Sequence, residues 1–79
     1  MALAQHNIIR QINEDPADAR VLRTGTPVWA VVGHWRAVGK AKAQVAQDYG
    51  LMLEEVEAVL AYHRIHREAV DARLRANAE

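Results

Sequence analysis

Residues 26–39 read TPVWAVVGHWRAVG and give the clearest helix signal in the chain. Thr26 can cap a helix through its hydroxyl, and Pro27 has the backbone geometry of a first helical position. The apolar residues that follow recur at helical spacing and form one stripe, which comprises Val28, Val31, Val32, Trp35 and Val38. Gly39 can end the helix in the left-handed conformation. We therefore predict a helix that begins at this Thr-Pro pair and ends near Gly39.

Three residues of this helix predict contacts with other parts of the structure, namely Trp29, Gly33 and Trp35. Gly33 costs the helix about 1 kcal/mol relative to alanine, which a close-packed neighbour would explain. Trp29 and Trp35 are six positions apart, which is about 240° around the helix axis, so one helix cannot bury both against the same neighbour. We expect one tryptophan to face the core and the other a second surface, where tryptophan is a frequent anchor of an interface.

Two more helical segments follow. Residues 41–48 predict a short helix that Gly50 can end, and a third helix begins near Leu53. The third pattern either bends or breaks near His66 or runs on to about Asn77. A straight helix of 25 residues would span about 37 Å. Because that exceeds what a chain of 79 residues needs, we expect its distal end to pack on another chain.

The N-terminal part is less regular. Residues 5–14 suit a short strand or one helical turn, and Asp15–Pro16 is typical of a turn because proline steers the preceding residue out of the helical region. We predict one domain of the mainly α class, with residues 1–26 as an extended, β or dimerisation segment and residues 27–79 as three or four helices. Short helix, tight turn and longer helix are the pattern of a helix-turn-helix, and also of any small three-helix domain.

Composition excludes several classes of protein. The chain is 51% apolar, but alanine accounts for 15 of these residues, so the core is thin for a monomer and we expect a homodimer or another partner. Without cysteine there is no disulfide framework and no thiolate metal site. The sequence has no apolar run of about 18 residues and no signal peptide, so we expect no membrane contact and a cytoplasmic location.

Charge gives a restricted indication of nucleic-acid binding. The formal net charge is zero, which argues against a strongly basic nucleic-acid binder acting alone. A basic surplus occurs only over residues 30–50, and we take Arg23, Lys40 and Lys42 as candidate phosphate contacts. The first turn of the third helix contains the carboxylates Glu54, Glu55 and Glu57. These acids argue against base reading by that helix, because the DNA groove is lined by phosphates.

Catalytic and metal chemistry find little support. The sequence has no serine for a Ser-His-Asp nucleophile, and its four glycines are too scattered for a phosphate-binding loop. His63 and His66 are three positions apart and could share one helix face. No companion ligand is aligned with both, whereas zinc needs three or four. We therefore expect no enzyme activity, no metal site and no cofactor.

Residues 23–29 read RTGTPVW and resemble the Gly-Thr-Arg-x-Pro-Val-Trp stretch of the family called domain of unknown function 433. The resemblance extends over about residues 15–71, through the segments Ala37–Gly39, Asp48–Tyr49, Glu54–Val56 and Ala58–Tyr62. The Gly-Gly-Lys-Pro stretch of the family is absent, as is the arginine after Gly25-Thr26. Met52 replaces the usual Ser or Thr cap of the third helix, at a cost of about 1 kcal/mol.

This resemblance implies a helix-turn-helix protein with a short N-terminal β element. Members of the family are often encoded beside PIN-domain ribonucleases and are treated as VapB-like antitoxins, which implies one contact to a toxin, one to operator DNA, and a dimer. The expected function is therefore that of an antitoxin in a type II pair, which sequesters the ribonuclease and contributes to autoregulation. The alternatives are a DNA-binding regulator without a toxin and a non-catalytic dimerisation module.

We assign the partner or dimer surface to the first helix and the distal part of the third. The candidate residues are Trp29, Trp35, Tyr62, His63, His66, Arg67, Val70 and Leu74. Arg64, Arg67 and Arg73 could pair with the carboxylate-rich metal pocket that the resemblance implies for a PIN nuclease.

Overall fold

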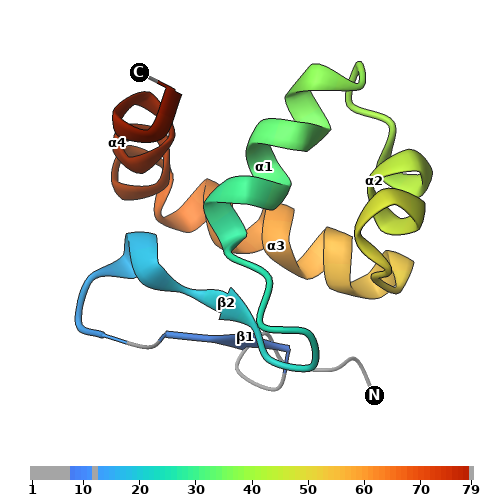
Figure 1. The fold of residues 1–79 in the computed structure, drawn as a ribbon. Coiled ribbons are helices and arrows are strands. Elements are labelled where there is room, and N and C mark those ends of the chain that lie inside the picture. The colour runs from blue at the N-terminus through green and yellow to red at the C-terminus, as the bar shows by residue number, and fades with distance from the viewer. Residues whose placement is uncertain (1–7, 12, 79) are drawn as a thin grey trace.

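The computed structural model describes residues 8–11 and 13–78, which form α-helices and a small antiparallel sheet (Figure 1). In chain order the elements are β1 (Ile9–Arg10), the 3-10 helix η2 (Pro16–Asp18), β2 (Arg20–Val21), α1 (Val28–Ala37), α2 (Lys42–Tyr49), α3 (Leu53–Ile65) and α4 (Arg67–Ala78). The helix α3 is central, because it packs against α1, α2, α4 and β1. The prediction of a mainly α fold with a short N-terminal strand region is confirmed.

The start of α1 differs from the prediction. The helix begins at Val28, and Pro27 is the capping residue, with extended backbone angles and no side-chain cap. The hydroxyl of Thr26 instead lies 2.7 Å from the hydroxyl of Thr24. The N–H of Val28 donates to the carbonyl of Ala19 at 2.9 Å. A long-range backbone hydrogen bond therefore satisfies the first helical donor, and Thr26 is not the cap.

The helices α1 and α2 end with the same backbone geometry. Gly39 and Gly50 both adopt the left-handed conformation, with φ of 69° and 66°. The residue after each glycine donates its N–H five positions back, from Lys40 to the Trp35 carbonyl at 2.7 Å and from Leu51 to the Ala46 carbonyl at 2.8 Å. This is the Schellman closure, which satisfies carbonyls at the helix end. The predicted helix ends are thus confirmed.

The third helical pattern breaks at His66, where φ is −117° and ψ is 40°. After the break, α4 folds back against α1 and η2 (Figure 1). A Cβ on Gly33 would lie 2.8 Å from Leu74 Cδ2, so the close-packed neighbour expected at this glycine is present. The alternative of a straight helix is wrong, because the chain breaks at His66 and α4 packs on this chain's own α1. A contact of α4 with another chain stays a prediction.

The core consists of small branched side chains from every layer. The largest fully buried side chains are all valines, namely Val21, Val28, Val31, Val32, Val45, Val56, Val59 and Val70. They belong to one hydrophobic cluster, against which Trp29, Trp35 and Leu74 pack with part of their surface exposed. Because β2 and α4 contribute to the same cluster as α1–α3, the N-terminal sheet and the helices fold together.

The N-terminal segment contains a short strand at Ile9–Arg10. Ile9 pairs with Val21 and Arg10 with Arg20 in an antiparallel register. This resolves the alternative of strand or helical turn in favour of a strand at Ile9–Arg10; residues 5–7 and 12 lie outside the described residues. The β2 strand also receives a second neighbour, because the N–H of Val21 donates to the carbonyl of Thr26 at 2.8 Å.

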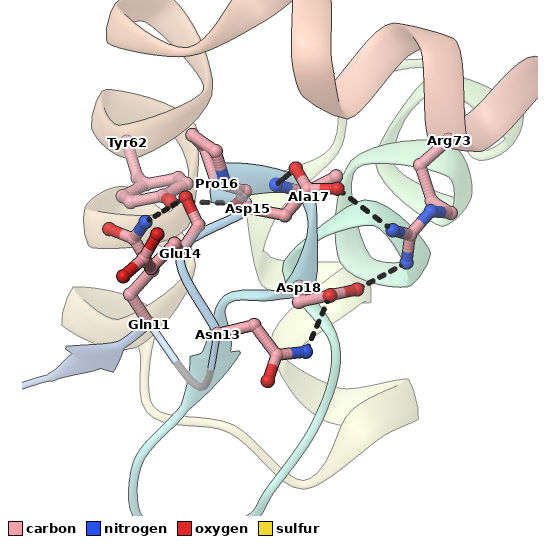
Figure 2. A network of polar contacts seen from close by, with 9 residues as sticks. All are labelled: Gln11, Asn13, Glu14, Asp15, Pro16, Ala17, Asp18, Tyr62 and Arg73. Carbon is pink, nitrogen blue, oxygen red and sulfur yellow. Dashed lines mark hydrogen bonds and ion pairs between the residues drawn. The ribbon is translucent and has the colours of Figure 1, made fainter.

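A polar clamp joins η2 to the two C-terminal helices (Figure 2). The Tyr62 hydroxyl on α3 donates to the carbonyl of Pro16 at 2.8 Å. From α4, the guanidinium of Arg73 donates to the carboxylates of Asp18 and Asp15. Hydrogen bonds from Asn13 and Arg73 hold the pKa of Asp18 below its ordinary value. The clamp fixes the position of α4 relative to the N-terminal segment.

Candidate functional site

A groove of about 350 Å³ lies between the end of α1, the start of α2 and the junction of α3 with α4. Its lining contains five cationic side chains and no carboxylate; the cationic residues are Arg36, Lys40, Lys42, Arg64 and Arg67. The rest of the lining consists of Trp35, Leu60 and His63. We call these eight residues the basic groove. It joins segments that are up to 32 positions apart in the sequence, from Trp35 to Arg67.

Helix ends place these cations. Lys40 follows the glycine that closes α1, and Lys42 is the first residue of α2. The break at His66 puts Arg64 in the last turn of α3 and Arg67 at the start of α4. Lys40 has a φ of 66°, which is uncommon for a residue other than glycine. Its ammonium lies 5.6 Å from the centroid of the Trp35 ring, a contact worth about 0.5–1 kcal/mol when exposed.

The positive charge of the groove is only partly neutralised. Arg36 pairs with Asp71 at 3.1 Å, and Lys42 lies 3.9 Å from Glu57 on the surface. An exposed ion pair such as Lys42–Glu57 contributes about 0–1 kcal/mol to stability, so an anion can readily replace Glu57 as the partner of Lys42. Within residues 8–11 and 13–78, Lys40, Arg64 and Arg67 form no ion pair. The groove therefore attracts anions although the whole chain is neutral.

A polar network around the buried His63 supports the groove from the side of α4. His63 is 3% exposed, and its Nε2 lies 2.9 Å from Oδ1 of Asp71. The same carboxylate oxygen is 3.1 Å from Nη2 of Arg36. Burial raises the pKa of Asp71, but the hydrogen bonds and charges of His63 and Arg36 outweigh it, so this pKa lies below its ordinary value. The network connects α1, α3 and α4 and fixes the direction of Arg36.

The expected division of the two tryptophans between the core and a second surface is not seen, and the interface role stays a prediction. Trp29 and Trp35 both pack against the core with part of their surface exposed. The two side chains therefore share the core cluster, although Trp35 also lines the basic groove. The indole N–H of Trp35 is buried and has no hydrogen-bond partner among the residues described.

Of the three predicted phosphate contacts, Lys40 and Lys42 lie together in the basic groove and Arg23 does not. Arg23 donates to both carboxylate oxygens of Glu55 and to the carbonyl of Gly50. The hydrogen bond to Glu55 raises the pKa of Arg23 above its ordinary value. Because this guanidinium is held by partners of its own chain, we leave Arg23 out of the candidate site.

The acidic first turn of α3 does not present all of its carboxylates to solvent. Glu55 is buried, and its carboxylate accepts the backbone N–H of Met52 at 2.7 Å in addition to the bonds from Arg23. It therefore caps the helix start that Met52 itself cannot cap, and it does not face solvent. Glu54 and Glu57 remain exposed. The argument that three acids oppose base reading does not hold for Glu55, because the partners of its carboxylate lie within the chain.

Most of the predicted partner surface is covered by the chain itself. Tyr62, His63 and Val70 are buried, and half-buried His66 lies against the Tyr62 ring with centroids 4.4 Å apart. Leu74 packs on the core. We therefore no longer assign these five side chains to a partner contact. Their burial follows from the return of α4 onto α1, which the helical pattern did not reveal.

Arg73 is likewise engaged, in the clamp with Asp15 and Asp18. The residues that remain exposed at the α3–α4 junction are Arg64, Ile65, Arg67 and Glu68, with Ile65 68% exposed. The sequence did not single out Ile65. The sequence feature that identifies Ile65 is its position as an apolar residue next to the helix break. This position is recognised only once the break at His66 is located.

Neither a metal site nor a membrane-spanning helix occurs in the part of the chain that the structure describes. No group of three His, Asp or Glu side chains is arranged to hold a metal ion. None of the helices there has both the length and the apolar character needed to cross a membrane.

Comparison with known proteins gives one match. The family described as "Protein of unknown function (DUF433)" matches residues 18–63, from η2 to the buried His63 of α3. No curated protein and no solved structure matches the chain. The match takes in six of the eight residues of the basic groove, and only Arg64 and Arg67 lie beyond it. With more than half of its residues matched, the chain belongs to the DUF433 family of proteins of unknown function.

Proposed function

We propose that this chain is a non-catalytic protein that binds the phosphate backbone of DNA through the basic groove, and that it serves as the antitoxin of a type II toxin–antitoxin pair. One observation carries the DNA contact: five cationic side chains from three segments line one groove without a carboxylate. Cationic clusters of this kind supply the sequence-independent part of DNA affinity by releasing counterions.

The position of the groove indicates how DNA is contacted. In a helix-turn-helix the first turn of the second helix contacts base edges. The corresponding helix in this chain is α3, whose first turn exposes Glu54 and Glu57. The cations of the groove come instead from the end of α1, the start of α2 and the α3–α4 junction, and Lys42 lies 3.9 Å from Glu57. Contacts of this kind fix the position of a protein on the duplex and carry no sequence information. A homodimer would add a second groove and thereby a preferred spacing.

Fluorescence anisotropy with a labelled duplex at low salt tests the DNA contact. The variant Lys42→Glu/Arg67→Glu reverses one charge on each side of the groove and should weaken binding at least tenfold. Arg10→Glu is the matched control, because Arg10 is exposed on β1, outside the groove. Equal affinity of the double variant and the control would show that DNA does not bind in the groove.

The antitoxin role is supported by the exposed junction of α3 and α4. Ile65 stands out between Arg64 and Arg67, neither of which has an ion pair within the described residues. An apolar side chain flanked by two guanidinium groups is complementary to an apolar pocket with a carboxylate rim, such as the metal pocket expected of a PIN-domain ribonuclease. We propose that this junction contacts the toxin.

Co-expression tests this contact with a PIN-domain ribonuclease from a neighbouring reading frame. Truncation at residue 63 is unsuitable, because it removes Val70 and Leu74 from the core. The variant Arg64→Glu/Ile65→Asp changes only exposed side chains and should abolish rescue of growth, while Arg10→Glu should rescue like the unmodified chain. Full rescue by the double variant, with its fold verified by circular dichroism, would contradict the assignment. Duplex binding without any neutralisation would favour a DNA-binding regulator that has no toxin.

A further inference from the structure

We propose that the basic groove is also a pocket for a single nucleotide, which places its phosphate among Lys42, Arg64 and Arg67 and its base against Trp35 and Leu60. This inference rests on the proposed function, since both use the same groove. It goes further by naming the ligand: a nucleoside 5′-monophosphate, whether free in solution or at the 5′ end of a nucleic-acid strand.

The first reason is the lining of the groove. Contact with a duplex backbone requires cations at an open rim and no apolar wall. Here Trp35 and the buried side chain of Leu60 share the groove with the cations. An aromatic surface beside a cationic groove is the combination that binds an unstacked base together with its phosphate. The volume of about 350 Å³ lies within the range of about 300–1,000 Å³ that is usual for small-ligand pockets.

The second reason is the conformation of the turn between α1 and α2. Lys40 holds the left-handed backbone conformation, which is unfavourable for a side chain with a Cβ, and its ammonium lies over the Trp35 ring. The ring therefore contacts a cation as well as the core. A base can occupy the ring face in place of the ammonium, which is then free to approach the phosphate. Strained residues of this kind concentrate at binding sites.

The third reason is the charge of the ligand. A 5′-phosphate is a monoester and carries nearly two negative charges at neutral pH, whereas each phosphate within a strand carries one. Lys40, Arg64 and Arg67 form no ion pair within the described part of the chain, and Lys42 has one distant exposed partner. The excess of cations over local acids thus favours the doubly charged terminal phosphate.

The fluorescence of Trp35 provides the test. In a Trp29→Phe background Trp35 is the single tryptophan, and it lines the groove. Titration with AMP should change its emission in a saturable manner, while adenosine and inorganic phosphate should each require at least tenfold higher concentration. Adding Arg67→Glu should raise the Kd for AMP at least tenfold, and adding Arg10→Glu should leave it unchanged.

Three results would overturn the proposal: no saturable change with AMP up to millimolar concentration, equal affinity for inorganic phosphate, or an unchanged Kd in Arg67→Glu. If the Trp29→Phe chain does not fold, calorimetric titration of the unmodified chain with the same three ligands gives the same decision.

The two sources of the ligand can be separated with short single strands. Tighter binding of a 5′-phosphorylated strand than of AMP indicates a strand end, and equal binding of both indicates the free nucleotide. Failure of the inference is distinct from failure of the proposed function. Duplex binding without AMP binding rejects only the nucleotide pocket, whereas AMP binding without duplex binding rejects only the DNA contact.

Discussion

The guanidinium of Arg23 donates to both carboxylate oxygens of Glu55, from Nε to Oε2 at 2.9 Å and from Nη2 to Oε1 at 2.8 Å. The same Nη2 donates to the carbonyl of Gly50 at 2.9 Å, and the carboxylate also accepts the N–H of Met52. One buried acid therefore holds the loop after β2, the turn between α2 and α3, and the start of α3. This relationship explains why Arg23 stabilises the fold and is not a phosphate contact. It also explains why the buried carboxylate of Glu55 does not repel an anion.

The first prediction is a loss of stability in acid that depends on Glu55. The hydrogen bond from Arg23 holds the pKa of Glu55 below its ordinary value of 4.5 in the folded chain. A lowered pKa stabilises the fold above pH 4.5, and this contribution disappears as the pH falls through the folded pKa. Glu55→Gln should be less stable than the unmodified chain near pH 7 and should approach it below pH 4.5.

Urea denaturation between pH 3 and 7 measures this convergence. Glu54→Gln is the matched control, because Glu54 occupies the same helical turn and is exposed. Asp18, Asp48 and Asp71 also have lowered pKa values, so the difference between variants decides the outcome and not the absolute slope. A Glu55→Gln curve that runs parallel to that of the unmodified chain at all pH values would be incompatible with the prediction.

The second prediction concerns Gly33 and Leu74. Alanine at position 33 gains about 1 kcal/mol of helix propensity, but its Cβ would meet Leu74 Cδ2 at 2.8 Å. Overpacking of this kind costs about 1–3 kcal/mol. We expect Gly33→Ala to be neutral or destabilising in the unmodified chain, and stabilising by about 1 kcal/mol when Leu74→Ala has removed the obstacle. A double-mutant cycle from thermal unfolding measures this, and additive effects would refute the contact.

The third prediction concerns the network beneath the basic groove. Asp71→Asn keeps the shape of the side chain but removes the charge that pairs with Arg36 and His63. Because the His63 side chain is buried, weakening its hydrogen bond should cost about 1–3 kcal/mol in the free energy of unfolding. Glu68→Gln, at an exposed position of α4, is the control. If both variants unfold at the same urea concentration, the network does not stabilise the fold.

The fourth prediction tests the clamp in Figure 2. Replacing Arg73 by Met keeps the apolar stem and removes the bonds to Asp15 and Asp18. The amide of Ala19, which donates to Pro16 within η2, should then exchange with solvent several-fold faster. Arg75→Met, on the exposed surface of α4, should leave this exchange rate unchanged. Hydrogen-exchange mass spectrometry measures both, and identical protection in the two variants would exclude a role for the clamp.

Local signals in the sequence predicted the helices and their ends well. Gly39 and Gly50 end α1 and α2 because a left-handed residue without a Cβ is a signal that needs no distant partner. The start of α1 is predicted to within one residue, but the capping role of Thr26 is wrong for the opposite reason. There the carbonyl of Ala19 satisfies the first donor, and Thr24 binds the hydroxyl of Thr26. Neither contact is visible in the local pattern.

The candidate site could be predicted only in part. Lys40 and Lys42 were found because they lie close together in a stretch with excess positive charge. Arg36, Arg64 and Leu60 join them only after α3 packs on α1 and the chain breaks at His66. The helical periodicity continues across this break, so the sequence left both a bend and a straight helix open. The same uncertainty led to a predicted partner surface of which Tyr62, His63 and Val70 are buried within the chain.

The salt dependence of duplex binding tests most directly whether the basic groove contacts phosphates. Up to four cations are available, because Lys40, Arg64 and Arg67 have no ion pair among the described residues and Lys42 has an exposed one. At about 0.9 per neutralised phosphate, log K against log salt concentration should fall with a slope of about −3 to −4. The variant Lys42→Glu/Arg67→Glu should reduce this slope by about 2. A slope near zero, or one that the double variant leaves unchanged, would contradict phosphate binding in the groove.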